Sequence, residues 1–313
     1  MPTLTRPRVA ISLGDINGIG IEIALKAHAE ISKLITPLYC INTALLNSAA
    51  QLLNVDIPDD FEISEIGDAV DIEPGLVSSK SGEFSYHSFL HAVELAKEKE
   101  VEAVVTLPIH KEAWSLAGID YKGHTDMLRD IFQKDAIMML GCSELYVALF
   151  TEHIPLQAVA STVTLKRLTG FLEDLHHAIG DHKVAVLGLN PHAGDNGVLG
   201  NEEEIITEAI SSLNDALGKK VFVGPVVPDI AFTPHFRKQF TYFVAMYHDQ
   251  GLGPLKALYF DESVNISLNL PIIRTSVDHG TAFDIAYKGE AKTLSYINAV
   301  HAALEFIKAK QSF

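Results

Sequence analysis

The sequence contains only two cysteines, Cys40 and Cys142, in 313 residues. They lie far apart and form neither a C-x-x-C pair nor the spacing of a zinc knuckle. This arrangement argues against a disulfide framework and against a cysteine-based metal site. Isolated free thiols are typical of proteins in a reducing compartment, so we expect a cytoplasmic protein.

Long hydrophobic runs are also missing. The first apolar segment, residues 9–13, is followed at once by the polar residues 14–17, and it is too short for the core of a signal peptide. No other segment reaches the roughly 18 consecutive apolar residues that a membrane-spanning helix requires. We therefore expect neither export nor a membrane segment.

Positive charge is scarce, because 24 lysines and arginines stand against 40 aspartates and glutamates, a formal net charge of -16. Binding to nucleic acid or to an acidic membrane depends on lysine and arginine, so this balance argues against both partners. An anionic ligand must then be small and held by a few local cations. The length allows two domains, and 48% hydrophobic residues are ordinary for a globular protein.

Apolar runs of strand length alternate with amphipathic segments of helix length, which predicts an α/β fold with a largely parallel sheet. The expected strands are residues 8–13, 38–42, 101–107, 145–151, 156–162, 184–189, 222–225, 243–247 and 265–270. The expected helices are residues 19–30, 43–53, 84–99, 165–179, 202–217 and 296–308.

The loop after the first expected strand contains Gly14, Gly18 and Gly20. It matches neither G-x-G-x-x-G nor G-x-x-x-x-G-K-[ST], the patterns of two common nucleotide-binding loops. Two interpretations stay open for this loop: a cradle for phosphate, and a tight turn from strand to helix.

Three histidines follow shortly after apolar strands: His153, His192 and His248. In parallel α/β sheets the carboxyl ends of the strands line the ligand crevice, so these imidazoles could converge. Three neutral imidazoles with open positions for water or substrate form a catalytic type of site for Zn²⁺, Co²⁺, Ni²⁺ or Mn²⁺. The alternative is that they are ordinary surface or core residues among the 14 histidines of the chain.

The segment from Tyr247 to Lys256 combines an imidazole, a carboxylate, two glycines and an amine directly after an expected strand. We predict a turn here, since the segment is too polar for the core. Its composition indicates a functional site, and a solvated surface turn is the alternative.

Four motifs occur in order along nearly the whole chain: residues 14–22, Gly123-His124-Thr125-Asp126, residues 189–194 and residues 247–252. Together they resemble the 4-hydroxythreonine-4-phosphate dehydrogenase family of pyridoxal phosphate biosynthesis. The resemblance implies NAD- or NADP-linked oxidation and decarboxylation of 4-phosphohydroxy-L-threonine to 3-amino-2-oxopropyl phosphate.

The same resemblance implies a homodimer in which each active site takes metal-binding histidines from both subunits. These histidines correspond to His153, His192 and His248, with one divalent ion (Zn, Mg, Co, Mn or Ni) per site. The implied substrate contacts are His124, Thr125, Lys256, Asn265 and Arg274.

Two departures from the family pattern bear on substrate preference. Ile16 and Asn17 stand where the family commonly has Pro-Ala, and His110 stands where it commonly has Asn. Relatives of this family act on other phosphorylated four-carbon hydroxy acids. The same chemistry on threonate or erythronate 4-phosphate is therefore an alternative.

Residues 279–289 are similar to the adenosine-binding loop of isocitrate and isopropylmalate dehydrogenases, which bind a nicotinamide cofactor without G-x-G-x-x-G. This second resemblance implies cofactor contacts at His279, Gly280, Thr281 and Asp284. It also implies two α/β/α domains with the active-site cleft between them. We expect a cofactor-side domain of residues 1–127 and 270–313, and a metal-binding and dimerisation domain of residues 128–269.

The chemistry that the resemblance implies assigns roles to the remaining polar groups. A divalent ion at the substrate hydroxyl favours departure of hydride and then of CO₂. Arg274 and Lys256 supply local cations for phosphate or carboxylate. Lys256 and Asp249 are both candidates for the general base, and Asp249 could instead orient His248. A metal-dependent hydrolase or lyase, and a binding module without turnover, are the rival interpretations.

Overall fold

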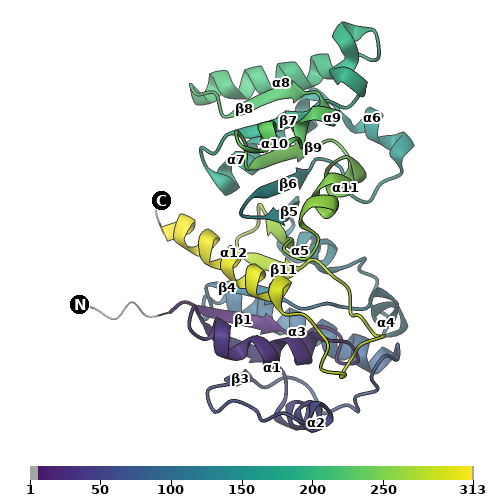
Figure 1. Ribbon diagram of the computed structural model, residues 1–313, viewed down its shortest axis with the longest axis vertical. Coiled ribbons are helices and arrows are strands. Elements are labelled where there is room, and N and C mark those ends of the chain that lie inside the picture. Colours follow the sequence, from purple (N-terminus) through teal and green to yellow (C-terminus); the bar gives the residue numbers. More distant parts are fainter. Residues whose placement is uncertain (1–5, 312–313) are drawn as a thin grey trace, which may run out of the picture. The chain divides into compact units, whose positions relative to one another are not determined.

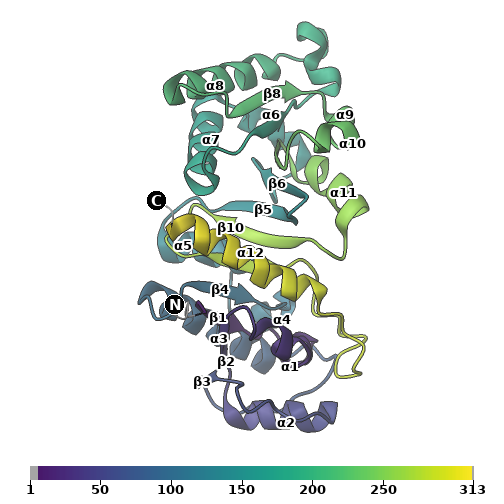
Figure 2. The same cartoon turned by 60° about the vertical axis from the view of Figure 1, so that its left-hand side comes forward.

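The computed structural model describes residues 6–311, which form two α/β units (Figures 1 and 2). The first unit takes the chain up to residue 134, residues 264–266 and the chain from residue 270. The second unit takes residues 135–263 and 267–269. The expected domain boundaries fall after residues 127 and 269, and the roles expected for the two domains stay predictions.

The first unit is built on a parallel sheet with strand order β3-β2-β1-β4-β11. Strands β1, β2, β4 and β11 are almost wholly buried, as expected where helices cover both faces of a sheet. The strands are β1 (Arg8–Ser12), β2 (Thr36–Cys40), β3 (Ile63–Ser64), β4 (Ala103–Thr106) and β11 (Arg274–Val277). The helices are α1 (Gly20–Ile31), α2 (Thr43–Leu53), α3 (Ser79–Lys97), α4 (Lys111–Leu116), α5 (His124–Phe132) and α12 (Leu294–Gln311).

The second unit has strand order β5-β6-β9-β7-β8, parallel except for the β5–β6 hairpin. The strands are β5 (Ile137–Cys142), β6 (Leu145–Leu149), β7 (Val184–Leu187), β8 (Phe222–Val226) and β9 (Tyr242–Ala245). The helices are η1 (Leu156–Ala158), α6 (Val159–Thr162), α7 (Leu165–Ile179), η2 (Pro191–Gly197), α8 (Glu202–Leu217), α9 (Pro228–Ala231), α10 (Pro234–Arg237) and α11 (His248–Tyr259). Strand β10 (Val264–Leu268) gives its first three residues to the first unit and its last two to the second.

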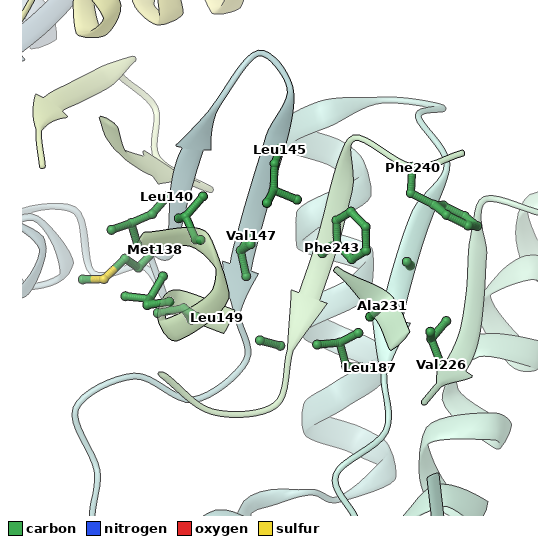
Figure 3. Packing of buried hydrophobic residues seen from close by; sticks show 14 residues of the cluster. Met138, Leu140, Leu145, Val147, Leu149, Leu187, Val226, Ala231, Phe240 and Phe243 are labelled. Atoms are coloured by element: carbon green, nitrogen blue, oxygen red, sulfur yellow. The ribbon is translucent and has the colours of Figure 1, made fainter. Parts of the chain in front are cut away.

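The core of the second unit lies where α11 covers the sheet. Figure 3 shows Val147, Leu187 and Phe243 among the buried side chains that neighbouring strands contribute. A Cβ atom at Gly251 would lie 2.5 Å from Val147 Cγ1 and 2.8 Å from Ala245 Cβ. The absence of a side chain at Gly251 therefore lets α11 pack directly on β6 and β9.

Three local predictions are wrong. Residues 156–162 form η1 and α6 rather than a strand, and the hydroxyls of Ser161 and Thr162 donate to the Ala158 carbonyl. Residues 248–256, predicted as a turn, belong to α11, which tolerates Pro254 inside it. Residues 274–277, predicted as a loop, form the buried strand β11.

In the part of the chain that the structure describes, no helix is both long and apolar enough to cross a membrane.

The glycine loop after β1 is a tight turn whose backbone N–H groups bond within the protein. The N–H of Asp15 donates to the Pro108 carbonyl (2.8 Å), and that of Ile19 donates to the Thr281 carbonyl (3.1 Å). The N–H of Asn17 donates to Asp15 Oδ1 (2.9 Å). These donors are already engaged, which favours the turn over the phosphate cradle.

Gly14 is the position on which this turn depends. It has a φ of +69°, and a Cβ there would lie 2.1 Å from the Pro108 carbonyl oxygen. Gly14→Ala should lower the melting temperature by at least about 5 °C, because strain and a backbone clash add to one another. Calorimetry measures the shift. Gly118→Ala is the matched control, since Gly118 has a φ of +77° but nothing within 4 Å, and an equal shift in both variants would contradict the prediction.

Candidate active site

Arg274, His124 and Thr106 meet inside the first unit. Arg274 begins β11 and is only 2% exposed, Thr106 ends β4, and His124 begins α5. One guanidinium nitrogen, Nη2, donates to Thr106 Oγ1 (2.7 Å) and lies 3.0 Å from His124 Nδ1. The structure therefore brings two of the predicted substrate residues, Arg274 and His124, into direct contact.

The protonation state of His124 follows from this contact. Burial, and then the positive charge of Arg274, hold the pKa of His124 well below 6.5. The neutral ring accepts at Nδ1 from the guanidinium, so its single proton lies on Nε2. In the residues that the structure describes, Nε2 is buried without a hydrogen-bond partner. An N–H donor is thus held ready beside a buried cation.

Aromatic side chains fix the His124 ring. Phe89 lies edge-on to it with ring centroids 4.3 Å apart, and Trp114 is 5.8 Å away at 89°. The indole N–H of Trp114 donates to Ser85 Oγ (2.7 Å), which anchors the indole on α3. The imidazole therefore has little freedom to turn its Nε2–H elsewhere.

The cluster is suited to a small anion. Burial lowers the pKa of Arg274 to about 9, and both partners described above are neutral, so they do not cancel its charge. Thr125 is buried next to His124, and Asn265 has a buried Oδ1 without a partner within residues 6–311. Lys256, the fifth predicted substrate residue, belongs to the second unit, where its Nζ lies 5.4 Å from the Phe260 ring.

His153 and His248 lie side by side in the second unit, with ring centroids 5.6 Å apart. Asp249 Oδ1 is 2.7 Å from His248 Nδ1, which leaves Nε2 of that ring for a metal. Metal–nitrogen bonds of about 2.0–2.1 Å place two imidazoles of one site about 5–6 Å apart, so this pair fits a divalent ion. His192 does not join them: across residues 6–311, no three His, Cys, Asp or Glu side chains are grouped to hold a metal.

The predicted cofactor loop crosses the glycine turn of the first unit. Thr281 is buried, and its carbonyl accepts from Ile19 N–H, whereas Gly280 and Asp284 are exposed. His279 Nδ1 lies 3.0 Å from the Gly280 carbonyl. The loop thus carries exposed polar groups and is held to the glycine turn by the hydrogen bond at the Thr281 carbonyl.

The two departures from the family pattern contact this loop. The His110 ring stacks on Phe283 with centroids 4.8 Å apart, and the Tyr287 hydroxyl donates to the Ile16 carbonyl (2.7 Å). The structure therefore places His110 and Ile16 against the predicted cofactor loop. The sequence pointed to these positions but associated them with the substrate.

Sequence reasoning missed several supporting residues. Thr106 was taken only as part of a strand, and Glu203 only as part of a helix. Asp15 is fully buried, its carboxylate accepts from Ser81 Oγ (3.2 Å), and burial raises its pKa. An acidic residue shortly after a buried strand is a signal that could have identified Asp15.

Comparisons with known proteins agree with the motifs. A family model described as pyridoxal phosphate biosynthetic protein PdxA matches residues 33–303. A 4-hydroxythreonine-4-phosphate dehydrogenase from Sulfurimonas denitrificans is 64% identical over 301 residues, which cover 96% of this chain and 98% of that protein. The crystal structure of a 4-hydroxythreonine-4-phosphate dehydrogenase from Klebsiella pneumoniae matches with a TM-score of 0.82 and 33% identity, covering 96% of this chain and 99% of that one.

A more distant likeness bears on the fold alone. A β-decarboxylating dehydrogenase from Thermococcus kodakarensis matches with a TM-score of 0.52 and 14% identity, over 96% of this chain and 84% of that one. The predicted α/β fold of the isocitrate and isopropylmalate dehydrogenase type is thus confirmed.

The neutral state of His124 predicts a pH dependence of stability. Its folded-state pKa lies below the unfolded value near 6.5, so the unfolded chain takes up the proton first as the pH falls. The stabilising contribution is complete above pH 6.5 and is lost as the pH falls toward the folded pKa. Between pH 7.5 and 5.5, His124→Gln should lose about 1 kcal/mol less unfolding free energy than wild type.

Urea unfolding at both pH values measures this difference. His235→Gln, at an exposed position, is the control and should behave like wild type. If wild type and His124→Gln lose equal stability over this range, His124 is not held neutral by burial.

Proposed function

Since the chain belongs to the family of the pyridoxal phosphate biosynthetic protein PdxA, we propose that it is an NAD(P)-dependent dehydrogenase acting on 4-phosphohydroxy-L-threonine. The reaction oxidises the substrate hydroxyl and releases CO₂, giving 3-amino-2-oxopropyl phosphate. The observation that carries the proposal is the buried Arg274–His124–Thr106 cluster. It offers a charged fork and an oriented N–H to an anionic group in an otherwise acidic protein.

Arg274 and His124 act by binding and orientation. The guanidinium attracts a phosphate or carboxylate, and its planar fork can hold two oxygens at once. His124 adds a neutral donor at Nε2, so it contributes direction without a second charge. Thr125 and Asn265, which belong to the same unit, complete this set of polar groups, and Lys256 is the further substrate cation that the family resemblance implies.

His153, His192 and His248 are the residues that would hold a divalent ion. The proposal includes a cytoplasmic homodimer whose active sites draw these histidines from both copies, as the family resemblance implies. When bound, the ion supplies positive charge beside the substrate hydroxyl, which eases loss of its proton and of hydride. Asp249 keeps His248 in the orientation that presents Nε2.

We assign removal of the hydroxyl proton to Lys256. Lys256 and Asp249 are both on α11 and are the two candidates for the base. Asp249 already holds His248 Nδ1 at 2.7 Å, which makes it an orienting group. The amine of Lys256 is therefore the better candidate for the base.

The nicotinamide cofactor, NAD or NADP, is assigned to the loop that begins at His279. Gly280 leaves room for close approach of a ligand, and the exposed carboxylate of Asp284 can accept from sugar hydroxyls. Thr281 fixes the loop to the turn beneath it through its carbonyl. The loop thus provides a rigid edge for the adenosine half of the cofactor.

The direct test is absorbance at 340 nm with NAD⁺ or NADP⁺ and 4-phosphohydroxy-L-threonine, with threonate and erythronate 4-phosphates in parallel. We expect NADH or NADPH with the amino substrate, and we expect a chelator to stop its formation. His192→Ala should lose this activity while remaining folded, whereas His235→Ala should retain it.

Each other outcome of this assay removes a part of the proposal. Reduced cofactor only with the sugar acids would change the substrate, and full turnover of His192→Ala in metal-free buffer would remove the metal. Product formation without cofactor reduction would indicate a hydrolase or lyase.

Arg274→Lys tests the anion site. The substitution keeps a positive charge but loses the fork, so we expect KM for the substrate to rise about 10- to 100-fold with a smaller change in kcat. Arg167→Lys, at an exposed position on α7, is the matched control. An unchanged KM in Arg274→Lys would exclude Arg274 from substrate binding.

A further inference from the structure

The turn that carries His192 has an unusual backbone. Five consecutive residues are in the left-handed region, with φ of 53° at His192, 51° at Ala193, 77° at Gly194, 44° at Asp195 and 55° at Asn196. Four of these residues have side chains, and each costs about 1 kcal/mol or more in this conformation. Such a turn persists only where the surrounding structure holds it.

Glu203 holds the beginning of this turn. Its side chain is 7% exposed, and Oε1 accepts from the backbone N–H of Asn190 (2.7 Å). Oε2 accepts from Asn190 Nδ2 (2.9 Å). A Cβ at Gly194 would lie 2.7 Å from Glu203 Oε2, so the turn closes directly over the carboxylate. Both oxygens of this buried carboxylate therefore accept hydrogen bonds from Asn190, just before His192.

Gln250 connects this turn to the start of α11, which carries His248. Its Oε1 accepts from the backbone N–H of Met246 (2.7 Å), two residues before His248. Its Nε2 donates to the Gly188 carbonyl (2.7 Å), 62 residues away. Gly188 in turn lies against Ala193, because a Cβ there would be 3.0 Å from Ala193 Cα. One amide side chain therefore links both histidine-bearing segments.

We propose that Gln250, supported by Glu203, is a positioning residue that fixes the His248 and His192 segments to one another within each protomer. The inference rests on the proposed metal role of these histidines. An amide suits this place, because it accepts from one backbone group and donates to another. A metal site that uses His192 and His248 depends on the orientation of both rings before the ion binds. The Gln250 bridge fixes the two segments that carry these rings.

Gln250→Glu is the sharpest variant. The carboxylate can still accept from Met246 N–H, but it cannot donate, and it faces the Gly188 carbonyl with like polarity. Gln250→Met has a similar length without either hydrogen bond, and it serves if the charged variant does not fold. Gln239→Glu makes the same chemical change at an exposed position of the same unit and is the matched control.

Hydrogen exchange of the metal-free protein tests the link itself. Gln250→Glu should speed amide exchange in residues 190–199 as well as in residues 246–250, whereas Gln239→Glu should match wild type. The inference is overturned if the faster exchange is confined to residues 246–250. This readout needs neither metal nor turnover, so it is independent of the proposed function.

Cobalt binding tests the consequence. Titration with Co²⁺, followed by visible absorbance of the full-length protein, should show an affinity about 10- to 100-fold weaker in Gln250→Glu and Gln250→Met than in wild type. Equal affinity in all variants would overturn the positioning role. If wild type itself binds no Co²⁺ while the exchange result is as expected, the metal role fails and the link between the segments stands.

Discussion

The buried positive charge of Arg274 determines which polar and aromatic groups surround it in the first unit. Arg274 enters a parallel sheet at the start of β11, where water cannot solvate its guanidinium. The neighbours must then supply polar partners, and Thr106 and His124 are two of them. Burial, and then the same charge, lower the pKa of His124 and keep its ring neutral, and the contact of Nη2 with Nδ1 leaves the proton on Nε2. Aromatic packing by Phe89 and Trp114 follows from the need to hold that ring still.

The regular elements could be predicted where local signals agree. The expected bounds of α2, α7 and α8 are those observed, because side-chain caps and a left-handed glycine mark their ends: Asn42, Thr164 and Gly218. Strand β5 was missed, although Gly141 fixes the hairpin with a Cβ position 1.9 Å from the Leu145 carbonyl oxygen. Helix α11 was taken for a turn because Gly251 serves close packing rather than chain reversal.

The candidate site was only partly predictable. Its place after a strand indicated His248, and the family resemblance indicated His124 and Arg274. A contact between residues 150 apart, such as that of Arg274 with His124, depends on the folded sheet. The same holds for Gln250, whose bonding partner is 62 residues away. The left-handed turn at His192 has no sequence signature beyond its glycines, since four of its five residues carry side chains.

The two contacts of the predicted cofactor loop, at Ile16 and at His110, differ in how far they restrict amino-acid substitution. Tyr287 donates to a main-chain carbonyl at Ile16, and a carbonyl is present whatever side chain stands there. This hydrogen bond therefore does not restrict the side chain at position 16. His110 instead offers its own ring to Phe283, so positions 110 and 283 must change together. Substitutions at 110 and 283 should be found as pairs, whereas those at 16 should occur alone.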